Sequence, residues 1–157
     1  MGLFSRKKET VKKEAEKMAA PVTGEMIPME EVADPVFSQK VLGDGVAFKP
    51  EENMVVSPIS GSLETVFPTG HAFGVKSGER EILVHIGINT VELNGEGFKI
   101  LKEAGCQVKA GEAVIELDLE KLKNTTYDLT TMLIITAGGD VSFADKHAVT
   151  AGEVIEA

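Results

Sequence analysis

Short apolar runs recur along the chain from residue 20 onward, and Gly, Pro or charged residues separate them. Runs of this length with such punctuation are typical of short β-strands joined by turns. We expect strands over residues 22–27, 45–49, 54–57, 61–67, 71–76, 81–86, 107–108, 113–117, 132–136 and 154–156, and short helices over 35–41, 97–102 and 119–123. So many short strands predict an all-β fold, an antiparallel β-sandwich or barrel-sandwich hybrid, in preference to a parallel α/β sheet.

A weak internal repeat indicates that this fold contains a duplicated motif. Residues 108–116 (VKAGEAVIE) resemble residues 149–156 (VTAGEVIE), so an Ala-Gly-Glu turn followed by an aliphatic run occurs twice. Each copy is expected to contribute one turn and one strand to a common core. The repeat bears on the fold and not on the function.

The first eighteen residues have the pattern of a separate element. Phe4, Val11, Ala15 and Met18 are spaced by seven, four and three residues, which would place them on one stripe of a helix. Residues 1–18 carry a net charge of +3, which leaves −12 for the rest of the chain. Two interpretations stay open, a solvated tail and a weak peripheral tether to an anionic membrane surface. The folded domain is therefore expected over residues 19–157.

Composition narrows the class of protein. A chain of 157 residues with 43% hydrophobic content suits one domain with its own core, and no apolar run is long enough to span a membrane. The net charge of −9 argues against nucleic acid as a partner and favours a basic protein surface. Cys106 is the only cysteine and the start of the chain is charged, so we expect a cytoplasmic protein without intrachain disulfides.

Candidate chemistry lies with two histidines in neighbouring apolar runs. His85 falls within residues 82–88, and His71 begins the run at residues 71–75. The polar residues between the runs predict a β-hairpin. With a three-residue loop at residues 77–79, His71 would lie directly opposite His85, their Cβ atoms about 4.5–5.5 Å apart. A loop of another length would make the two diagonal neighbours or move one to the other face.

Strand alternation assigns the neighbours of these histidines to faces. His85 shares its face with Leu83, and His71 would share its face with Phe73. The opposite face of the second run carries the aliphatic side chains expected in the core, which are Ile82, Val84, Ile86 and Ile88. Two histidines on an apolar, accessible surface suggest a metal site, an acid–base pair, or a nucleophile with a supporting donor.

Several alternatives are disfavoured by missing partners. A catalytic zinc site takes three protein ligands, and no H-x-H or HExxH array accompanies the two histidines. The third histidine, His147, lies in a polar stretch and is expected to be exposed. No Walker loop, Gly-rich nucleotide fingerprint or carrier lysine at a hairpin tip is present, so no bound cofactor is expected.

Four motifs resemble one known family. They are residues 42–47 (LGDGVA), 57–61 (SPISG), 69–74 (TGHAFG) and 84–93 (VHIGINTVEL), the last followed by GEGF at 95–98. In this order they resemble the glucose-type enzyme IIA family of the bacterial phosphoenolpyruvate-dependent sugar phosphotransferase system. The resemblance extends from about residue 20 to the C-terminus, and the basic Gly-Leu-Phe start resembles the free-standing form of the family.

The resemblance implies a phosphocarrier whose only covalent group is a transient phosphohistidine. His85 would accept a phosphoryl group on Nε2 from the carrier protein HPr and pass it to a cysteine of a IIB domain of a sugar permease. Its Nδ1 would donate to the carbonyl of Gly87. His71 would donate to a phosphoryl oxygen, with Thr69 assisting. A neutral imidazole suits this role, because the unperturbed pKa of histidine is about 6.5.

The family's docking surface implies a set of partner-contact residues here. An apolar patch would comprise Phe37, Val41, Phe67, Leu83 and Ile86, with Asp34 meeting arginines of the carrier; for each apolar residue, core packing is the alternative. Asn89 stands where the family usually has Asp, which predicts retained phosphorylation with weaker attraction to a basic carrier. A regulatory module that binds target proteins under the control of His85 phosphorylation remains the second hypothesis, and a monomer is expected in either case.

Overall fold

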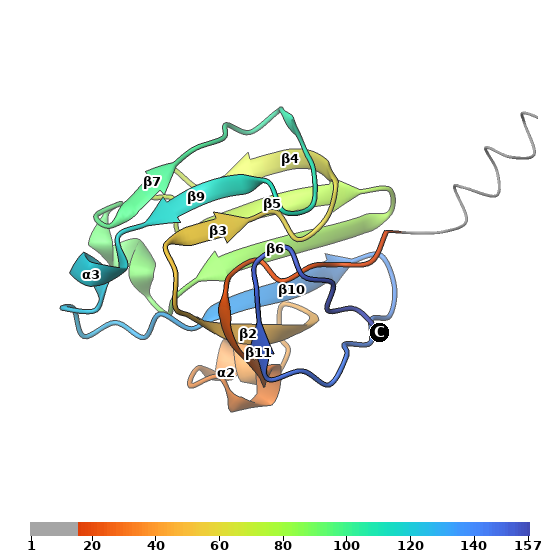
Figure 1. Ribbon diagram of the computed structural model, residues 1–157, viewed down its shortest axis with the longest axis horizontal. Coiled ribbons are helices and arrows are strands. Elements are labelled where there is room, and N and C mark those ends of the chain that lie inside the picture. Colours follow the sequence, from red (N-terminus) through yellow and green to blue (C-terminus); the bar gives the residue numbers. More distant parts are fainter. Residues whose placement is uncertain (1–15) are drawn as a thin grey trace, which may run out of the picture.

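Antiparallel strands make up most of residues 16–157, the part of the chain that the computed structural model describes (Figure 1). The strands are β1 (Gly24–Pro28), β2 (Asp44–Pro50), β3 (Met54–Val56), β4 (Gly61–Val66), β5 (Ala72–Ser77), β6 (Arg80–Ile86), β7 (Phe98–Ile100), β8 (Gln107–Val108), β9 (Ala113–Leu117), β10 (Thr131–Ala137) and β11 (Ala148–Val149). The helices are short: η1 (Met29–Glu31), α2 (Pro35–Ser38), η2 (Thr90–Leu93) and α3 (Leu119–Leu122). Across residues 16–157 none of these helices has the length and apolarity to cross a membrane.

The strands form two sheets. The larger has eight strands in the order β11-β1-β2-β10-β6-β5-β4-β8, and the smaller has three in the order β3-β9-β7. Every pairing between these strands is antiparallel. In Figure 1 the small sheet lies over the long strands β5 and β6. The predicted antiparallel β-sandwich is confirmed.

The main core fills the space between the two sheets. Alternation turns Phe48, Phe73 and Leu133 of the large sheet inward, and Val55 and Ile115 of the small sheet meet them; all five are fully buried. Each such side chain contributes roughly 1.5–3 kcal/mol to folding relative to an exposed position. The inner face of the large sheet is therefore closed and apolar.

A second apolar cluster covers part of the outer face of the large sheet. The segment η1–α2 folds over β1, β2 and β10 and buries Ile27, Met29, Val32, Phe37, Ala47, Ile88, Met132 and Ile134, while Leu83 of β6 packs against the edge of this cluster. Helix α2 begins after Asp34, whose carboxylate accepts a hydrogen bond from the Val36 N–H at 2.9 Å. It ends by Gln39, before Lys40 with φ +58, so it is shorter than the predicted helix over 35–41.

The two Ala-Gly-Glu turns occupy equivalent places in the fold. Gly111 and Gly152 have φ values of 88° and 89°, the left-handed region that favours glycine. The Gly111 N–H donates to the Ser57 carbonyl at 2.8 Å, and the Gly152 N–H donates to the Ala20 carbonyl at 2.9 Å. The sequence repeat thus corresponds to two turns with the same glycine conformation. In each turn the glycine N–H donates a hydrogen bond to a carbonyl of a segment distant in sequence.

Two predicted elements are wrong. The helix expected over residues 97–102 is strand β7, because Gly95 and Gly97 turn the chain at φ +89 and +90 and Lys99 then pairs with Glu116 of β9. The strand expected over residues 154–156 forms only isolated bridges. Pairing partners distant in sequence decide both outcomes.

The folded domain begins earlier than expected. Met18, which the apolar stripe assigned to a tail helix, is fully buried in the main core, and residues 16–18 are not helical. Its N–H donates to Glu156 Oε1 at 3.0 Å, and Arg80 binds both oxygens of the same carboxylate at 2.9 and 3.1 Å. The remaining residues of the predicted tail, 1–15, lie outside the described part of the chain.

Candidate functional site

The two histidines meet on the outer face of the large sheet, beside the edge of the η1–α2 segment. His85 lies near the end of β6, and His71 directly precedes β5. The strands β5 and β6 are neighbours in the sheet (Figure 1). Their ring centroids are 5.1 Å apart and their planes lie at 80°. The expectation that the two imidazoles come together is confirmed.

The predicted register of their hairpin is wrong by one residue. The turn has two residues, with Ser77 paired to Arg80, so Ala72 and not His71 lies opposite His85. Phe73 is fully buried in the main core and does not share a face with His71.

His71 still reaches His85 because it lies one residue before the β5 ladder. Its carbonyl accepts from the Ile86 N–H at 2.7 Å. The chain turns immediately before it at Gly70, with φ +75, whose N–H donates to the Phe67 carbonyl at 2.7 Å. Strand alternation, which would have pointed His71 toward the core, does not apply at this position.

A backbone carbonyl fixes the tautomer of His85. Its Nδ1 is 2.9 Å from the carbonyl oxygen of Gly87, the hydrogen bond that the family resemblance led us to expect. Because a carbonyl oxygen only accepts, Nδ1 carries the proton, and the neutral ring keeps its lone pair on Nε2. An imidazole in this form is a nucleophile at Nε2.

The turn that presents the Gly87 carbonyl requires glycine. Gly87 has φ +80, and a Cβ there would lie 2.3 Å from Thr90 Cγ2 and 3.0 Å from the Asp128 carbonyl oxygen. The Thr90 hydroxyl donates to the Ile86 carbonyl and is fully buried. Thr90 is a site residue that sequence reasoning missed, although its position three residues after Gly87 in GINT was available as a signal.

His71 is oriented by a side chain instead of by the backbone. Its Nδ1 lies 2.5 Å from Thr69 Oγ1. When the threonine hydroxyl donates to Nδ1, the proton of the neutral His71 ring resides on Nε2. The Phe67 ring packs edge-on against His71, with centroids 5.2 Å apart.

Both imidazoles are neutral near pH 7. Burial, followed by repulsion from His71, lowers the pKa of His85 to about 4, against smaller opposing effects of the Gly87 hydrogen bond and Asp34. Burial also lowers the pKa of His71. The site therefore offers one uncharged nucleophile and one uncharged hydrogen-bond donor without a proton being removed first.

Most of the expected contact patch surrounds the histidines. The Phe37 ring lies 5.1 Å from His85 and is nearly buried, while the Phe67 side chain is 39% exposed. Leu83 is half-buried on the face of His85, and Val41 is 67% exposed beyond α2. Asp34 is half-buried at the start of α2.

Ile86 does not belong to this patch. It is fully buried in the main core, so its assignment as a contact residue is wrong. Alternation places it on the inner face with Ile82 and Val84, as the pattern itself had indicated.

Asn89 is exposed just before η2, at φ +61, and its side chain makes no capping hydrogen bond.

The described residues offer no ready set of metal ligands. Within residues 16–157 no three His, Cys, Asp or Glu side chains are grouped so that they could hold a metal ion. His147 is exposed and lies beside β1, where its carbonyl accepts from the Met26 N–H at 2.7 Å. The expectation that no metal or cofactor is needed remains a prediction.

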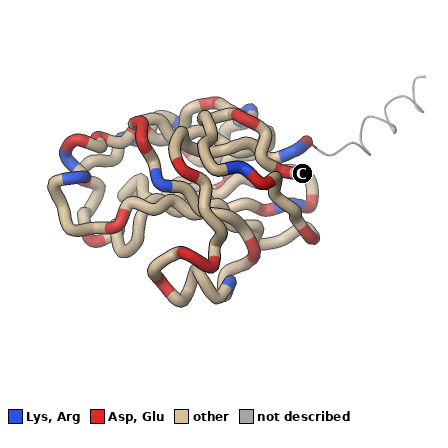
Figure 2. Tube along the Cα trace, turned by 60° about the horizontal axis from the view of Figure 1, so that its bottom comes forward, with Lys and Arg blue, Asp and Glu red and all other residues tan. Residues whose placement is uncertain are grey.

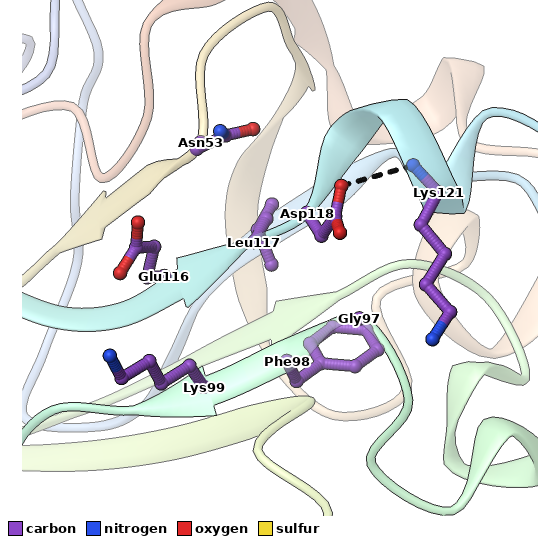
Figure 3. Close-up of a pocket in the computed structure, with 8 residues that line it drawn as sticks. All are labelled: Asn53, Gly97, Phe98, Lys99, Glu116, Leu117, Asp118 and Lys121. Atoms are coloured by element: carbon purple, nitrogen blue, oxygen red, sulfur yellow. Dashed lines mark hydrogen bonds between the residues drawn. The ribbon is translucent and has the colours of Figure 1, made fainter.

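A separate hollow of about 410 Å³ lies between β7, β9 and α3 (Figure 3). Two of its charged side chains have structural partners: Asp118 Oδ1 accepts from the Lys121 N–H at 3.1 Å and caps α3, and the Lys121 ammonium lies 3.5 Å from Glu96. The hollow contains no histidine and no nucleophile beside a base.

Known proteins resemble this chain over nearly its whole length. Residues 16–141 match the family described as phosphoenolpyruvate-dependent sugar phosphotransferase system, EIIA 1. A "PTS system glucose-specific EIIA component" of Staphylococcus epidermidis is 43% identical over 155 residues, covering 96% of this chain and 92% of that protein. Its counterpart in Staphylococcus aureus is 41% identical over the same length, with the same coverage.

A solved structure agrees in fold over nearly the whole chain. The glucose permease IIA of Mycoplasma capricolum matches with a TM-score of 0.85 and 36% sequence identity, covering 91% of this chain and 95% of that one. The sequence comparison and the structure comparison thus indicate the same family. The chain belongs to the EIIA 1 family of the phosphoenolpyruvate-dependent sugar phosphotransferase system.

Proposed function

We propose that this protein is a glucose-type phosphocarrier in which His85 accepts a phosphoryl group from phosphorylated HPr and donates it to a cysteine of a IIB domain. The observation that carries the proposal is the hydrogen bond from His85 Nδ1 to the Gly87 carbonyl at 2.9 Å. It reserves the Nε2 lone pair for phosphorus, and the low pKa of His85 keeps that lone pair free of a proton at pH 7.

In the first transfer, the Nε2 lone pair of His85 forms a bond to phosphorus while the N–P bond of the donor's phosphohistidine breaks. The electron pair of that bond returns to the donor's ring nitrogen. In the second transfer, the thiolate of the IIB cysteine attacks phosphorus and the N–P bond on His85 breaks. Both steps depend on positioning and on stabilising the charge of the phosphoryl oxygens.

His71 supplies that stabilisation in this mechanism. Thr69 donates to Nδ1 of His71, which leaves the Nε2–H of His71 to donate to a phosphoryl oxygen. The ring separation of 5.1 Å between His71 and His85 suits a phosphoryl group attached to one ring and contacted by the other. His71 thus acts on the transferred group and not as a second nucleophile.

The charge of the surface supports a basic donor protein. The chain has 25 acidic and 16 basic residues, and Figure 2 shows acidic positions recurring along the described trace. Asp34, close enough to His85 to raise its pKa, is the carboxylate best placed to attract a basic side chain of the donor.

Reconstitution tests the proposal. The protein is incubated with phosphoenolpyruvate, enzyme I and HPr, and acid-labile phosphate is mapped to a residue. We expect label on wild type, none on His85→Ala, and normal labelling of the control His147→Ala. Full labelling of His85→Ala, or an unlabelled wild type in a mixture that phosphorylates HPr, contradicts the proposal.

A regulatory role is the second candidate, and the exposed apolar side chains around the histidines favour it. Phosphorylation adds about −2 charge to this surface and would release a protein bound there. Pull-down with phosphorylated and unphosphorylated protein distinguishes the two roles, since only the regulatory role requires retention of a target that is not a phosphotransfer partner.

A further inference from the structure

Two consecutive peptide groups at Gly87 are each held by a hydrogen bond to the segment that precedes β10. The Gly87 N–H donates to the Thr130 carbonyl at 3.0 Å, and the Ile88 N–H donates to the Asp128 carbonyl at 2.9 Å. The second of these peptide groups is the one whose carbonyl accepts from His85 Nδ1 at 2.9 Å. The segment before β10 therefore supports the turn on which the tautomer of His85 depends.

The peptide group between Gly87 and Ile88 can transmit this contact to His85 because it is rigid. A trans peptide group is planar, so its N–H and its C=O point in opposite directions. Once the Ile88 N–H is fixed, the Gly87 carbonyl can no longer rotate away from His85 Nδ1. Hydrogen bonds in such a chain also polarise one another, which makes the Gly87 carbonyl a stronger acceptor.

The Asp128 carboxylate holds the supporting segment in shape. Its Oδ1 accepts from the Thr130 N–H at 2.9 Å and from the Thr130 hydroxyl at 2.6 Å. Thr130 is only 5% exposed, whereas Asp128 lies at the surface. An aspartate that binds the backbone two residues further on closes a turn. This turn fixes the directions of the Asp128 and Thr130 carbonyls, which are the two acceptors for the Gly87 turn.

We propose that Asp128 is a positioning residue for phosphoryl transfer, because the turn closed by its carboxylate holds the Gly87 carbonyl where it keeps the proton of neutral His85 on Nδ1. The inference deepens the proposed function and rests on it. In this role Asp128 acts through the backbone and does not contact the phosphoryl group. Loss of the carboxylate lowers the fraction of His85 that has a free lone pair on Nε2, and it leaves binding of the donor protein unchanged.

The tautomer of His85 can be observed directly in the unphosphorylated protein, with ¹⁵N-labelled histidine and NMR. In wild type, Nδ1 should have the ¹⁵N shift of a protonated ring nitrogen and Nε2 that of an unprotonated one. Asp128→Ala removes the acceptor for both groups of Thr130, so both shifts should move toward intermediate values as the second tautomer becomes populated. Asp128→Asn keeps a side-chain oxygen as acceptor and should retain the wild-type shifts.

Transfer kinetics provide the functional readout. Labelling of His85 is followed as a function of the concentration of phosphorylated HPr, at physiological salt, where distant surface charges are screened. Asp128→Ala should lower kcat about fivefold, the effect of one lost hydrogen bond, with an unchanged KM for HPr. Asp128→Asn should restore kcat.

Asp118→Ala is the matched control. Asp118 is also exposed, and its Oδ1 makes a similar contact outside the histidine site, accepting from the Lys121 N–H at 3.1 Å at the start of α3 (Figure 3). Tm is measured for both alanine variants, because a loss of stability alone would affect both. We expect only Asp128→Ala to change the His85 shifts and kcat. If Asp128→Ala does not fold, Thr130→Val removes the hydroxyl, keeps the N–H and should give a smaller change in the same direction.

Three results would overturn the inference. They are wild-type His85 shifts and kcat in folded Asp128→Ala or, in its place, Thr130→Val; a loss of kcat in Asp128→Asn as large as in Asp128→Ala; and the same changes in Asp118→Ala. The second would assign the effect to charge and the third to general stability. Failure of wild type to become labelled at His85, while its tautomer responds to Asp128→Ala, would instead contradict the proposed function.

Discussion

The two faces of the eight-stranded sheet are covered to different extents. The inner face packs against the small sheet, and its buried cluster consists of apolar side chains. The outer face is covered by η1–α2 over β1, β2 and β10 and is open over β5 near Gly74. His85 and His71 lie at the border between covered and open parts. That border gives enough burial to keep both imidazoles neutral while a partner protein can still reach them.

The largest difference expected between the faces concerns stability. Phe48→Ala removes a fully buried ring from the inner face and should lower the free energy of unfolding by about 3–5 kcal/mol. Val41→Ala, on the outer side, removes a side chain that is 67% exposed and should change it by less than about 0.5 kcal/mol. Urea unfolding measures both. A comparable loss in the two variants would show that the outer patch is structural and not a docking surface.

The next largest effect is expected from the loss of the His71 imidazole. His71→Gln should still become labelled at His85, but onward transfer should slow by about 10²–10³-fold, because the Gln amide, although it can donate, is not held in place by Thr69 as the His71 ring is. Quench-flow transfer to a IIB domain measures the rate. Thr69→Val, which removes only the hydroxyl that orients His71, serves as the graded comparison with a smaller loss. Normal onward transfer in His71→Gln would show that an imidazole oriented by Thr69 is not required at this position.

The glycine turn behind His85 should give an intermediate effect. Gly87→Ala combines positive φ with a Cβ 2.3 Å from Thr90, whereas Gly78→Ala, also at positive φ, has nothing within 4 Å of its Cβ. We expect Gly87→Ala to cost about 2–3 kcal/mol of stability and to slow labelling roughly tenfold, with Gly78→Ala costing about 1 kcal/mol and leaving labelling unchanged. Equal labelling rates in the two variants would show that the Gly87 carbonyl does not orient His85.

The outer face should also carry the pH dependence of stability. The pKa of His85 falls from 6.5 to about 4 on folding, so between these values the unfolded chain binds the proton and the folded protein does not. Stability therefore decreases as pH falls below about 6.5. Tm measured between about pH 6.5 and 5, above the titration of most carboxylates, should drop in wild type and drop less in His85→Gln. An identical slope in both would contradict the lowered pKa.

The smallest effect is expected at Asn89. Asn89→Asp introduces a carboxylate four residues after His85 and should speed labelling by HPr about twofold to fivefold at low salt, the gain disappearing at high salt. Gln107→Glu adds the same charge on β8 and should have no such effect. If Asn89→Asp and wild type react equally at low salt, the electrostatic explanation of this position is wrong.

The local sequence pattern predicted the strands and helices of this fold better than it predicted which strands pair with one another. The alternation around His85 placed Ile82 and Val84 in the core correctly, because those residues lie within one regular strand. The loop between the histidine runs was predicted one residue too long, since several turns are compatible with Ser77 to Arg80 and only pairing across the hairpin decides among them. For the same reason the sequence suggested a helix where β7 pairs with β9.

The site was predictable where its residues lie in the two histidine runs, and less so where distant segments contribute. The proximity of the His85 and His71 rings was expected from their positions in neighbouring runs, although Ala72, and not His71, pairs with His85 across the hairpin. The contact between Phe37 and His85 depends on η1–α2 folding over the sheet, which no periodicity indicates, and it was anticipated only through the family resemblance. Thr90 was missed because its function is to fill the space beside a glycine turn.

The atom that carries phosphorus tests the central claim most directly. Protein labelled with ¹⁵N in histidine is phosphorylated with phosphoenolpyruvate, enzyme I and HPr, and the N–P bond is located by NMR through the coupling of ³¹P to the ring nitrogen. Because Nδ1 of His85 is committed to the Gly87 carbonyl, the account predicts phosphorus on Nε2 of His85. Phosphorus on Nδ1 of His85, or on His71, would contradict it.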